Sequence, residues 1–312
     1  MFSIASRDER WSLGLPDLLH DQRLTHGEAT LHGSEIQATD AADRELLELA
    51  EQEMTAARDA VLGHGVRLEA RIVATARRTA SRVFTENVIT LSTAGLSVVT
   101  SPAHVEADRE RLLRIAAAVG DLSIDPHGVP MLWRNGTASV LLHEAAGHPA
   151  EHGQPMIEWP PWLSVRDEPG FDVDDAGRPV APVDLLRGAR PGALRRGSFA
   201  DVPLTRLSNV VVRQSGAPFH LPERHLEILL IAGGRYDPLI GTVSIFVAAA
   251  NLVEHGTVRG VRPFVIRESR DSVARAICGG RGETERYPGV ICSAEGQEIA
   301  VGSHAPEILV TF

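Results

Sequence analysis

From Arg206 to its C-terminus the chain consists mostly of strand-like runs that short turns separate. Runs of this length, rich in β-branched and aliphatic residues and bounded by turn residues, are typical of β-strands. Because strands joined by short turns pair in opposite directions, the sequence predicts an antiparallel sheet in this half of the chain. The runs are Leu207–Arg213, His225–Ala232, Gly241–Leu252, Thr257–Ile266 and Glu298–Val310.

The N-terminal part mixes helical and strand-like patterns. Apolar residues recur at a spacing of about 3.6 between Asp40 and Gly63, which predicts a helix there. A second helix is expected from Ser101-Pro102 to about Val119, because proline is tolerated in the first helical turn. Between the two helices, strand-like runs cover residues 66–73, 82–91 and 95–100.

Prolines and a glycine between residues 121 and 134 favour a domain boundary near residue 130. We therefore predict an α+β protein with two domains. Residues 1–129 form a small domain of helix and antiparallel sheet. Residues 130–312 form a sheet-rich domain that carries a short apolar helix, Ala138 to about Gly147, followed by surface loops over residues 153–205.

The composition excludes several classes of partner. The 312 residues carry a formal net charge of −10 without a basic cluster, which argues against nucleic acid and anionic membrane as main partners. The longest apolar run, Val243–Val253, is much shorter than the ~20 residues that span a bilayer, and the first residues lack a signal segment. We expect a cytoplasmic protein, in which Cys278 and Cys292 are free thiols or metal ligands rather than a disulfide.

Two histidines flank a glutamate at the end of the short apolar helix, in the run His143-Glu144-Ala-Ala-Gly147-His148-Pro149. The familiar zinc-protease spacing is four residues, which stacks both histidines on one helix face. Here the spacing is five, which in a straight α-helix separates the side chains by ~140°. Gly147 permits unusual backbone geometry, and Pro149 disfavours the α region for His148. We therefore predict that the helix ends or unwinds at Gly147 and brings His148 beside His143.

A catalytic zinc ion takes three protein ligands and leaves a fourth position for water. Glu144, next to the first histidine, is better placed as the general base for that water than as a ligand. The residues alone leave the third ligand open. The candidates are Cys292, Cys278, His152, Asp201 and Glu254.

Residues 138–151 resemble the metal-binding helix of the TldD/PmbA family of metallopeptidases, whose hallmark is His-Glu-x-x-x-His. The resemblance extends over most of the chain beyond residue 130. Asp167–Gly177 is similar to an acidic, glycine-containing loop of that family, and Arg206–Asn209 to its Arg-x-Ser/Thr-Asn segment. Val290–Gln297, followed by Val301-Gly302, resembles its closing cysteine motif.

This resemblance implies that Cys292 is the third zinc ligand, beside His143 and His148, and that Glu144 activates the water. It also implies a peptidase that cuts small or unstructured peptides and works as a homodimer, or as a heterodimer with a paralogue that lacks the metal motif. The chain departs from the family in its shorter region before residue 130 and in Ser293, where the family usually has glycine.

Two other functions stay open at this point. The shortened N-terminal region leaves room for an amidohydrolase or deacylase that acts on a small-metabolite amide in a biosynthetic pathway. A non-catalytic partner subunit is the third alternative, although a scaffold would not need the base Glu144.

Several residues near the motif have two readings. Glu151 either orients a ligand histidine or faces solvent. Arg206 and Asn209 either contact substrate or stabilise a strand end, and His152 is read as a polar loop residue.

The acidic residues Asp172, Asp174 and Asp175 lack the twelve-residue loop and terminal glutamate of an EF-hand. We interpret them as a turn. Cys278, next to Gly279-Gly280, is interpreted as a free thiol.

Overall fold

The computed structural model describes residues 3–13, 28–32, 48–49, 52, 55–56, 59–60, 68–78, 83–174, 176–195, 204–294 and 297–312. Its strands are β1 (Ser3–Leu13), β2 (Glu28–His32), β3 (Leu68–Arg78), β4 (Val83–Thr93), β5 (Leu96–Thr100), β6 (Met131–Trp133), β7 (Leu163–Asp167), β8 (Val183–Asp184), β9 (Leu194–Arg195), β10 (Leu204–Thr205), β11 (Asn209–Gln214), β12 (Arg224–Asp237), β13 (Thr242–Glu254), β14 (Thr257–Val261), β15 (Phe264–Ser269), β16 (Ile277–Ala294) and β17 (Gln297–Val310). Its helices and helical turns are α2 (Val105–Ala118), α3 (Ala138–Leu142), η1 (His143–Gly147), α4 (His148–Glu151), η2 (Leu185–Arg187) and α5 (Arg270–Ala276).

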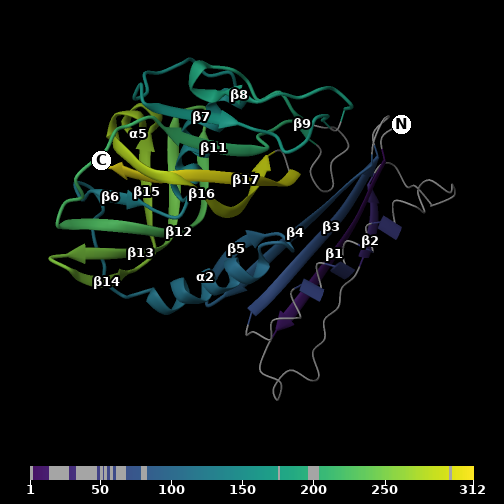
Figure 1. Cartoon of the computed structure of the whole chain (residues 1–312), viewed down its shortest axis with the longest axis horizontal. Helices are drawn as coiled ribbons and strands as arrows, with labels where there is room; N and C mark the ends of the chain where they lie inside the picture. Colours follow the sequence, from purple (N-terminus) through teal and green to yellow (C-terminus); the bar gives the residue numbers. More distant parts are fainter. Residues whose placement is uncertain are drawn as a thin grey trace.

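One sheet runs through the described residues and takes strands from both halves of the chain (Figure 1). Its order is β14-β13-β12-β6-β17-β16-β5-β4-β3-β1-β2, and β7, β8, β11 and β15 join it as branches. Most neighbouring strands are antiparallel, as predicted, whereas β6 with β12 and β11 with β17 are parallel. Together with the few short helices, this sheet confirms the α+β class.

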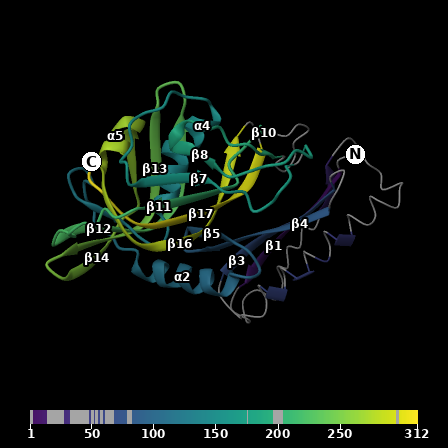
Figure 2. The same ribbon diagram turned by 45° about the horizontal axis from the view of Figure 1, so that its top comes forward.

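The N-terminal strands form an arm that extends away from the C-terminal body (Figures 1 and 2). β3, β4 and β5 confirm the three predicted strands, and β1, which pairs with β3 over its whole length, was not predicted. Of the first predicted helix, residues 48–49, 52, 55–56 and 59–60 are helical, and the rest of it lies outside the described residues.

The second predicted helix is α2, which begins at Val105 after a turn. It buries Val105, Leu112 and Ile115, three residues on one helical face, and packs on β4 and β5. Close to this helix β5 meets β16, where Val99 pairs with Gly289. The sheet is thus continuous across residue 130, and the division of the chain at 129/130 stays a prediction.

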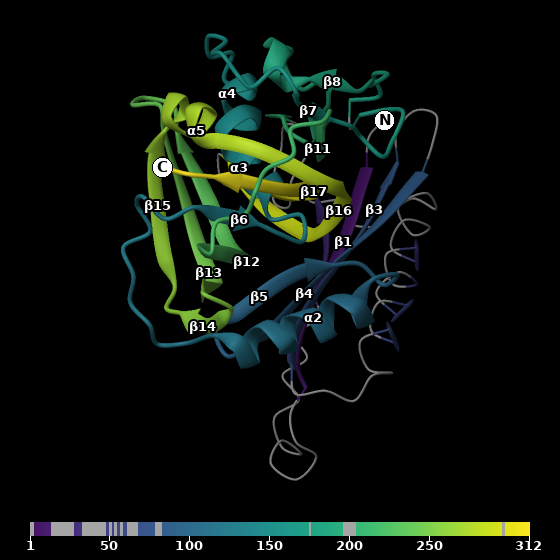
Figure 3. The same cartoon turned by 60° about the vertical axis from the view of Figure 1, so that its left-hand side comes forward.

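The C-terminal strands enclose α3 (Figure 3). All five residues of α3 are buried, and it packs against β17, β11 and β12. Four of its five residues are apolar, and the hydroxyl of Ser139 donates to the carbonyl of Gly136, so the helix can be covered all round. Neither α3 nor any other helix in the described parts of the chain is long and apolar enough to cross a bilayer.

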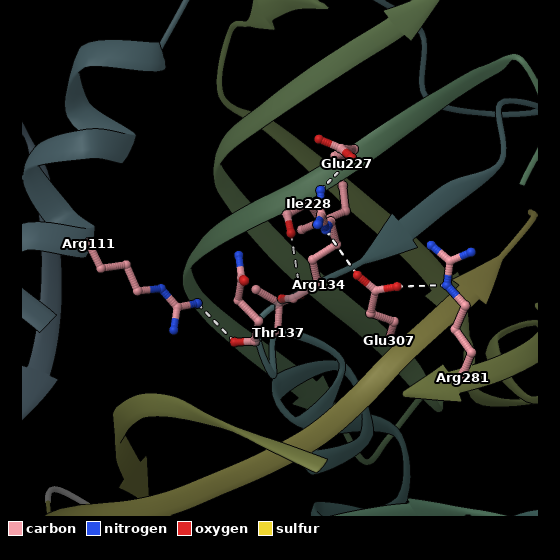
Figure 4. A network of polar contacts seen from close by, with 8 residues as sticks. Arg111, Arg134, Thr137, Glu227, Ile228, Arg281 and Glu307 are labelled. Carbon is pink, nitrogen blue, oxygen red and sulfur yellow. Dashed lines mark hydrogen bonds and ion pairs between the residues drawn. The ribbon is translucent and has the colours of Figure 1, made fainter. Parts of the chain in front are cut away.

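Ion pairs join four strands at the start of α3 (Figure 4). Arg134, directly after β6, donates to Glu227 on β12 at 2.7 Å and to Glu307 on β17 at 3.0 Å. Arg281 on β16 donates to the other oxygen of Glu307 at 2.8 Å. Because networks are worth more than isolated surface pairs, these contacts help to fix the strands that surround the helix.

A buried carboxylate ties β7 to the segment before β11. Oδ1 of Asp167 accepts hydrogen bonds from the backbone N–H groups of Ser208 (2.9 Å) and Asn209 (2.8 Å). Its Oδ2 is buried without a hydrogen-bond partner among the described residues. Burial raises the pKa of Asp167 to about 6, although the two N–H groups and Arg195 oppose the shift.

This raised pKa predicts a pH-dependent stability. The folded state holds the Asp167 proton more tightly than the unfolded chain, so the contribution of this group is favourable in acid. That contribution is lost as the pH rises from about 4 to about 6, by up to ~3 kcal/mol at 1.36 kcal/mol per pKa unit. Asp167→Asn keeps an acceptor for both N–H groups but cannot ionise. The unfolding free energy of the variant, minus that of the wild type, should therefore increase across this pH range in urea titrations. A difference in unfolding free energy between the two proteins that stays constant across this pH range would contradict the raised pKa of Asp167.

Candidate metal centre

The helix that carries the two histidines changes its winding between them. After α3, residues 143–147 form a π-helical turn, in which the backbone N–H of His148 donates to the carbonyl of His143. A bond from residue i+5 to residue i closes a turn that is one residue wider than an α-helical turn. Side chains five apart therefore stack much as side chains four apart do in an α-helix. The unwinding that the spacing required is confirmed, and its form is a π turn.

The predicted cause of this unwinding is wrong. His148 stays in the α region (φ −59°, ψ −41°) despite Pro149, and the helix continues as α4 to Glu151. Gly147 is helical as well, so the centre does not depend on its backbone freedom. What matters is its missing side chain, because a Cβ at this position would lie 2.4 Å from Cδ1 of the buried Leu207.

Both imidazoles meet the thiol of Cys292, which lies far along the chain on β16. The Sγ atom is 3.4 Å from Nε2 of His143 and 3.5 Å from Nε2 of His148. The ligand atoms of the three residues all lie within 4.8 Å of one another. Tetrahedral zinc, with Zn–N and Zn–S bonds of ~2.0–2.1 and ~2.3 Å, separates N and S by about 3.6 Å. The two N–S distances therefore agree with tetrahedral zinc, and the three residues form a group that could hold a metal ion.

None of the other candidates that the structure describes belongs to the group that could hold a metal ion. Cys278 is exposed at the start of β16, and Glu254 pairs with Arg224 and Arg259. Asp201 lies outside the described residues. His152 is exposed, with its ring centroid 6.3 Å from that of Tyr236.

Glu151 orients one of the histidines. Its Oε2 lies 2.5 Å from Nδ1 of His148, and its Oε1 accepts the backbone N–H of Leu207 at 2.7 Å. Of the two readings that the sequence allowed, the structure therefore supports the contact with a ligand histidine. A carboxylate on the outer nitrogen leaves Nε2 free to face a metal. Nδ1 of His143 is buried without a hydrogen-bond partner in the described parts.

Arg206 and Asn209 make structural contacts. The fully buried guanidinium of Arg206 donates to the backbone carbonyl of Cys292 at 2.7 Å. Oδ1 of Asn209 lies 3.0 Å from Nδ1 of His304 on β17. Both contacts hold strands in place, although Arg206 also lines the cavity described below.

The carboxyl of Glu144 is buried beside the three donors, with Oε2 3.7 Å from Nε2 of His148. Burial raises the pKa of Glu144 to about 7, with a further increase from Glu151, while His148 and a backbone hydrogen bond from Tyr236 act in the opposite direction. A carboxyl with this pKa can both accept and release a proton near neutral pH.

The surroundings shift the pKa values of the two histidines in opposite directions. Burial lowers the pKa of His143 well below its usual value, and the nearby charges of His148 and Arg206 add to this effect. Burial alone would also lower the pKa of His148, but Cys292, Glu151 and Glu144 raise it well above the usual value. Because metal ligands must give up their protons, a bound cation would take the place of the proton on His148.

Gly234 on β12 leaves room for Glu144, a role that the sequence analysis missed. A Cβ at this glycine would lie 2.4 Å from Cγ of Glu144. The available signal was the pair Gly233-Gly234 in an otherwise strand-like run, since glycine inside a strand often marks a close approach of another group.

A cavity of about 610 Å³ opens onto these groups. The helix with its histidines forms one wall, β12 and β13 form a second, and β16 with residues 204–206 forms a third. Its volume lies in the range of sites that bind small molecules.

The acidic cluster after β7 forms a turn, as predicted. Oδ1 of Asp174 accepts the backbone N–H groups of Ala176 and Arg178, and its Oδ2 accepts from the side chain of Arg178. Asp175 lies outside the described residues.

Comparisons with known proteins identify the fold. No family model and no curated protein sequence matches the chain. Among solved structures, TldE from Thermococcus kodakarensis is similar with a TM-score of 0.53 and 11% sequence identity, over 100% of this chain and 96% of that one. A protein from Bacteroides thetaiotaomicron VPI-5482 described as a "putative modulator of DNA gyrase" matches with a TM-score of 0.48 and 12% identity, over 100% of this chain and 93% of that one. The chain therefore has a fold like that of TldE, which agrees with the family that its motifs resemble.

Proposed function

We propose that this protein is a zinc-dependent hydrolase that cleaves peptide or amide bonds in small or unstructured peptides. The proposal rests on one observation: His143, His148 and Cys292 converge beside the buried carboxyl of Glu144 at the wall of a cavity. Three such donors and a neighbouring base are the parts that a metal hydrolase requires.

In this proposal His143, His148 and Cys292 hold the metal and Glu144 moves the proton. Zinc, when bound, would polarise the scissile carbonyl and acidify the attacking water. Glu144 accepts a proton from that water and returns it to the leaving amine, for which a pKa near 7 is suitable. Glu151 keeps the imidazole of His148 in the orientation that presents Nε2 to the metal.

The fold and the cavity support a peptidase. The fold like that of TldE agrees with the TldD/PmbA resemblance of the His-Glu-x-x-x-His and cysteine motifs. A cavity of about 610 Å³ has room for a few residues of an extended chain, and a folded domain is far larger. On the same resemblance we propose that the chain works as a homodimer or with a related subunit.

Metal analysis of cysteine variants tests the ligand set. The purified protein should contain about one zinc ion per chain. Cys292→Ser should lose it, because the thiolate is one of only three protein donors, and the matched control Cys278→Ser should retain it. Elemental analysis after dialysis gives both values. Equal zinc content in the two variants would exclude Cys292 as a ligand.

Removal of the base tests the mechanism. Glu144→Gln is nearly isosteric and should keep its zinc, but it should lower hydrolysis of an unstructured peptide by at least ~10²-fold, because the amide cannot accept a proton. The measurement combines zinc content with peptide cleavage followed by mass spectrometry. An undiminished rate in the zinc-loaded variant would remove Glu144 from the mechanism.

A further inference from the structure

The proposed base is held by β12 residues on either side of an arginine. Gly234 packs against Cγ of Glu144, and the backbone of Tyr236 hydrogen-bonds the carboxyl of Glu144. Arg235 lies between these two residues and lines the same cavity. Because side chains alternate along a strand, the side chain of Arg235 leaves β12 on the face opposite to Gly234. A group that binds to Arg235 would therefore lie in the same cavity as Glu144, beside the other face of the strand.

The guanidinium of Arg235 is available for such a group. The residue is exposed and has no hydrogen bond or ion pair within the described ranges. Asp237, two positions along β12 and on the same face, accepts the backbone N–H of Leu239 and does not pair with it. Several other exposed arginines in these ranges are paired with a carboxylate, such as Arg213 with Glu168 and Arg224 with Glu254. Arg206, the second arginine in the cavity wall, is buried and bound to a carbonyl.

A second unpaired arginine lies in the same row of the sheet. Ser244 on β13 pairs with Arg235 on one side and with Arg267 on β15 on the other. Residues paired across antiparallel strands share a face, and Arg267 is exposed and unpaired in the described structure. The positive charge at this side of the cavity is thus larger than that of one side chain.

An apolar contact adjoins the two arginines. Phe246 is two positions from Ser244 on the same face, is 40% exposed and lines the cavity. Gly233, its partner on β12, carries no side chain to cover it. Arginine beside an exposed aromatic ring is a combination that binds a planar carboxylate next to an apolar group.

We propose that the cavity selects amide substrates that carry a carboxylate, and that Arg235 binds this carboxylate. Arg267 adds positive charge at longer range, and Phe246 contacts the adjoining apolar part of the substrate. This inference rests on the proposed hydrolase function. The chain carries a net charge of −10 and repels anions at a distance. Selection for a carboxylate must therefore come from local positive charge, which Arg235 and Arg267 supply. The carboxylate can belong to an acidic side chain or to the C-terminus of a peptide.

Binding to an inactive, zinc-loaded protein tests the selection without turnover. We would use Glu144→Gln with three fluorescent peptides of equal length: an uncharged peptide with an amidated C-terminus, one with a single glutamate and an amidated C-terminus, and one with a free C-terminus. Fluorescence anisotropy should show about five- to ten-fold tighter binding of one carboxylate peptide or of both. The peptide that gains affinity identifies the source of the carboxylate.

Variants at Arg235 assign the effect. Arg235→Gln in the Glu144→Gln background should abolish the preference, and Arg235→Lys should retain part of it. Arg235→Glu should instead favour a fourth peptide, in which a lysine replaces the glutamate. Arg262→Gln is the matched control, because Arg262 is exposed, has no side-chain partner in the described residues and does not line the cavity. This control should leave the preference unchanged.

The outcomes separate the two proposals. A preference that disappears in Arg235→Gln, together with no cleavage by the wild type, would support the carboxylate site and overturn the hydrolase. Cleavage without any preference for carboxylate peptides would overturn the carboxylate site alone. A preference that survives Arg235→Gln would also overturn it.

Discussion

A four-residue segment, Arg206–Asn209, connects the two parts of the chain that carry the proposed ligands. Arg206 donates to the backbone carbonyl of Cys292, and the backbone N–H of Leu207 donates to Glu151, which holds His148. The helix is not part of the sheet that contains β16, so strand pairing alone does not set the distance between them. The distance between the sulfur and the imidazoles therefore depends on this segment, more than on the regular pairing of strands.

Buried groups hold the segment in turn. Asp167 accepts two of its backbone N–H groups, and the side chain of Leu207 fills the space that Gly147 leaves open. A larger residue at 147 would push Leu207 away and shift the N–H that Glu151 accepts. Residues outside the group of His143, His148 and Cys292 thus control its geometry through packing, since cores of native density transmit small displacements.

The sequence predicted the parts whose local pattern is strong. The C-terminal strands followed from apolar runs between turns. The two histidines followed from their spacing around Glu144, Cys292 followed from a family resemblance, and the structure brings the three residues together. The π turn could not be predicted, because α-helical and π-helical hydrogen bonding leave the same apolar pattern over five residues. The partners of Gly147 and Gly234 could not be predicted, because the atoms for which they leave room, on Leu207 and Glu144, come from other segments. The pair Gly233-Gly234 signalled a close approach but did not identify the group. β1 lacks a distinctive pattern of its own and takes its register from β3.

The packing at β12 also explains why recognition should fall to Arg235 and Phe246. Any side chain at Gly234 would displace Glu144, so this position cannot bind substrate through a side chain of its own. Gly233 has none either, and Tyr236 is mostly buried, with its backbone bound to Glu144. Among the cavity residues of β12, Arg235 therefore has the only side chain free to contact a ligand, and Phe246 on the neighbouring strand extends the same face. Gly234, which makes room for the base, and Gly233 thus leave the side-chain contacts with substrate to Arg235 and Phe246.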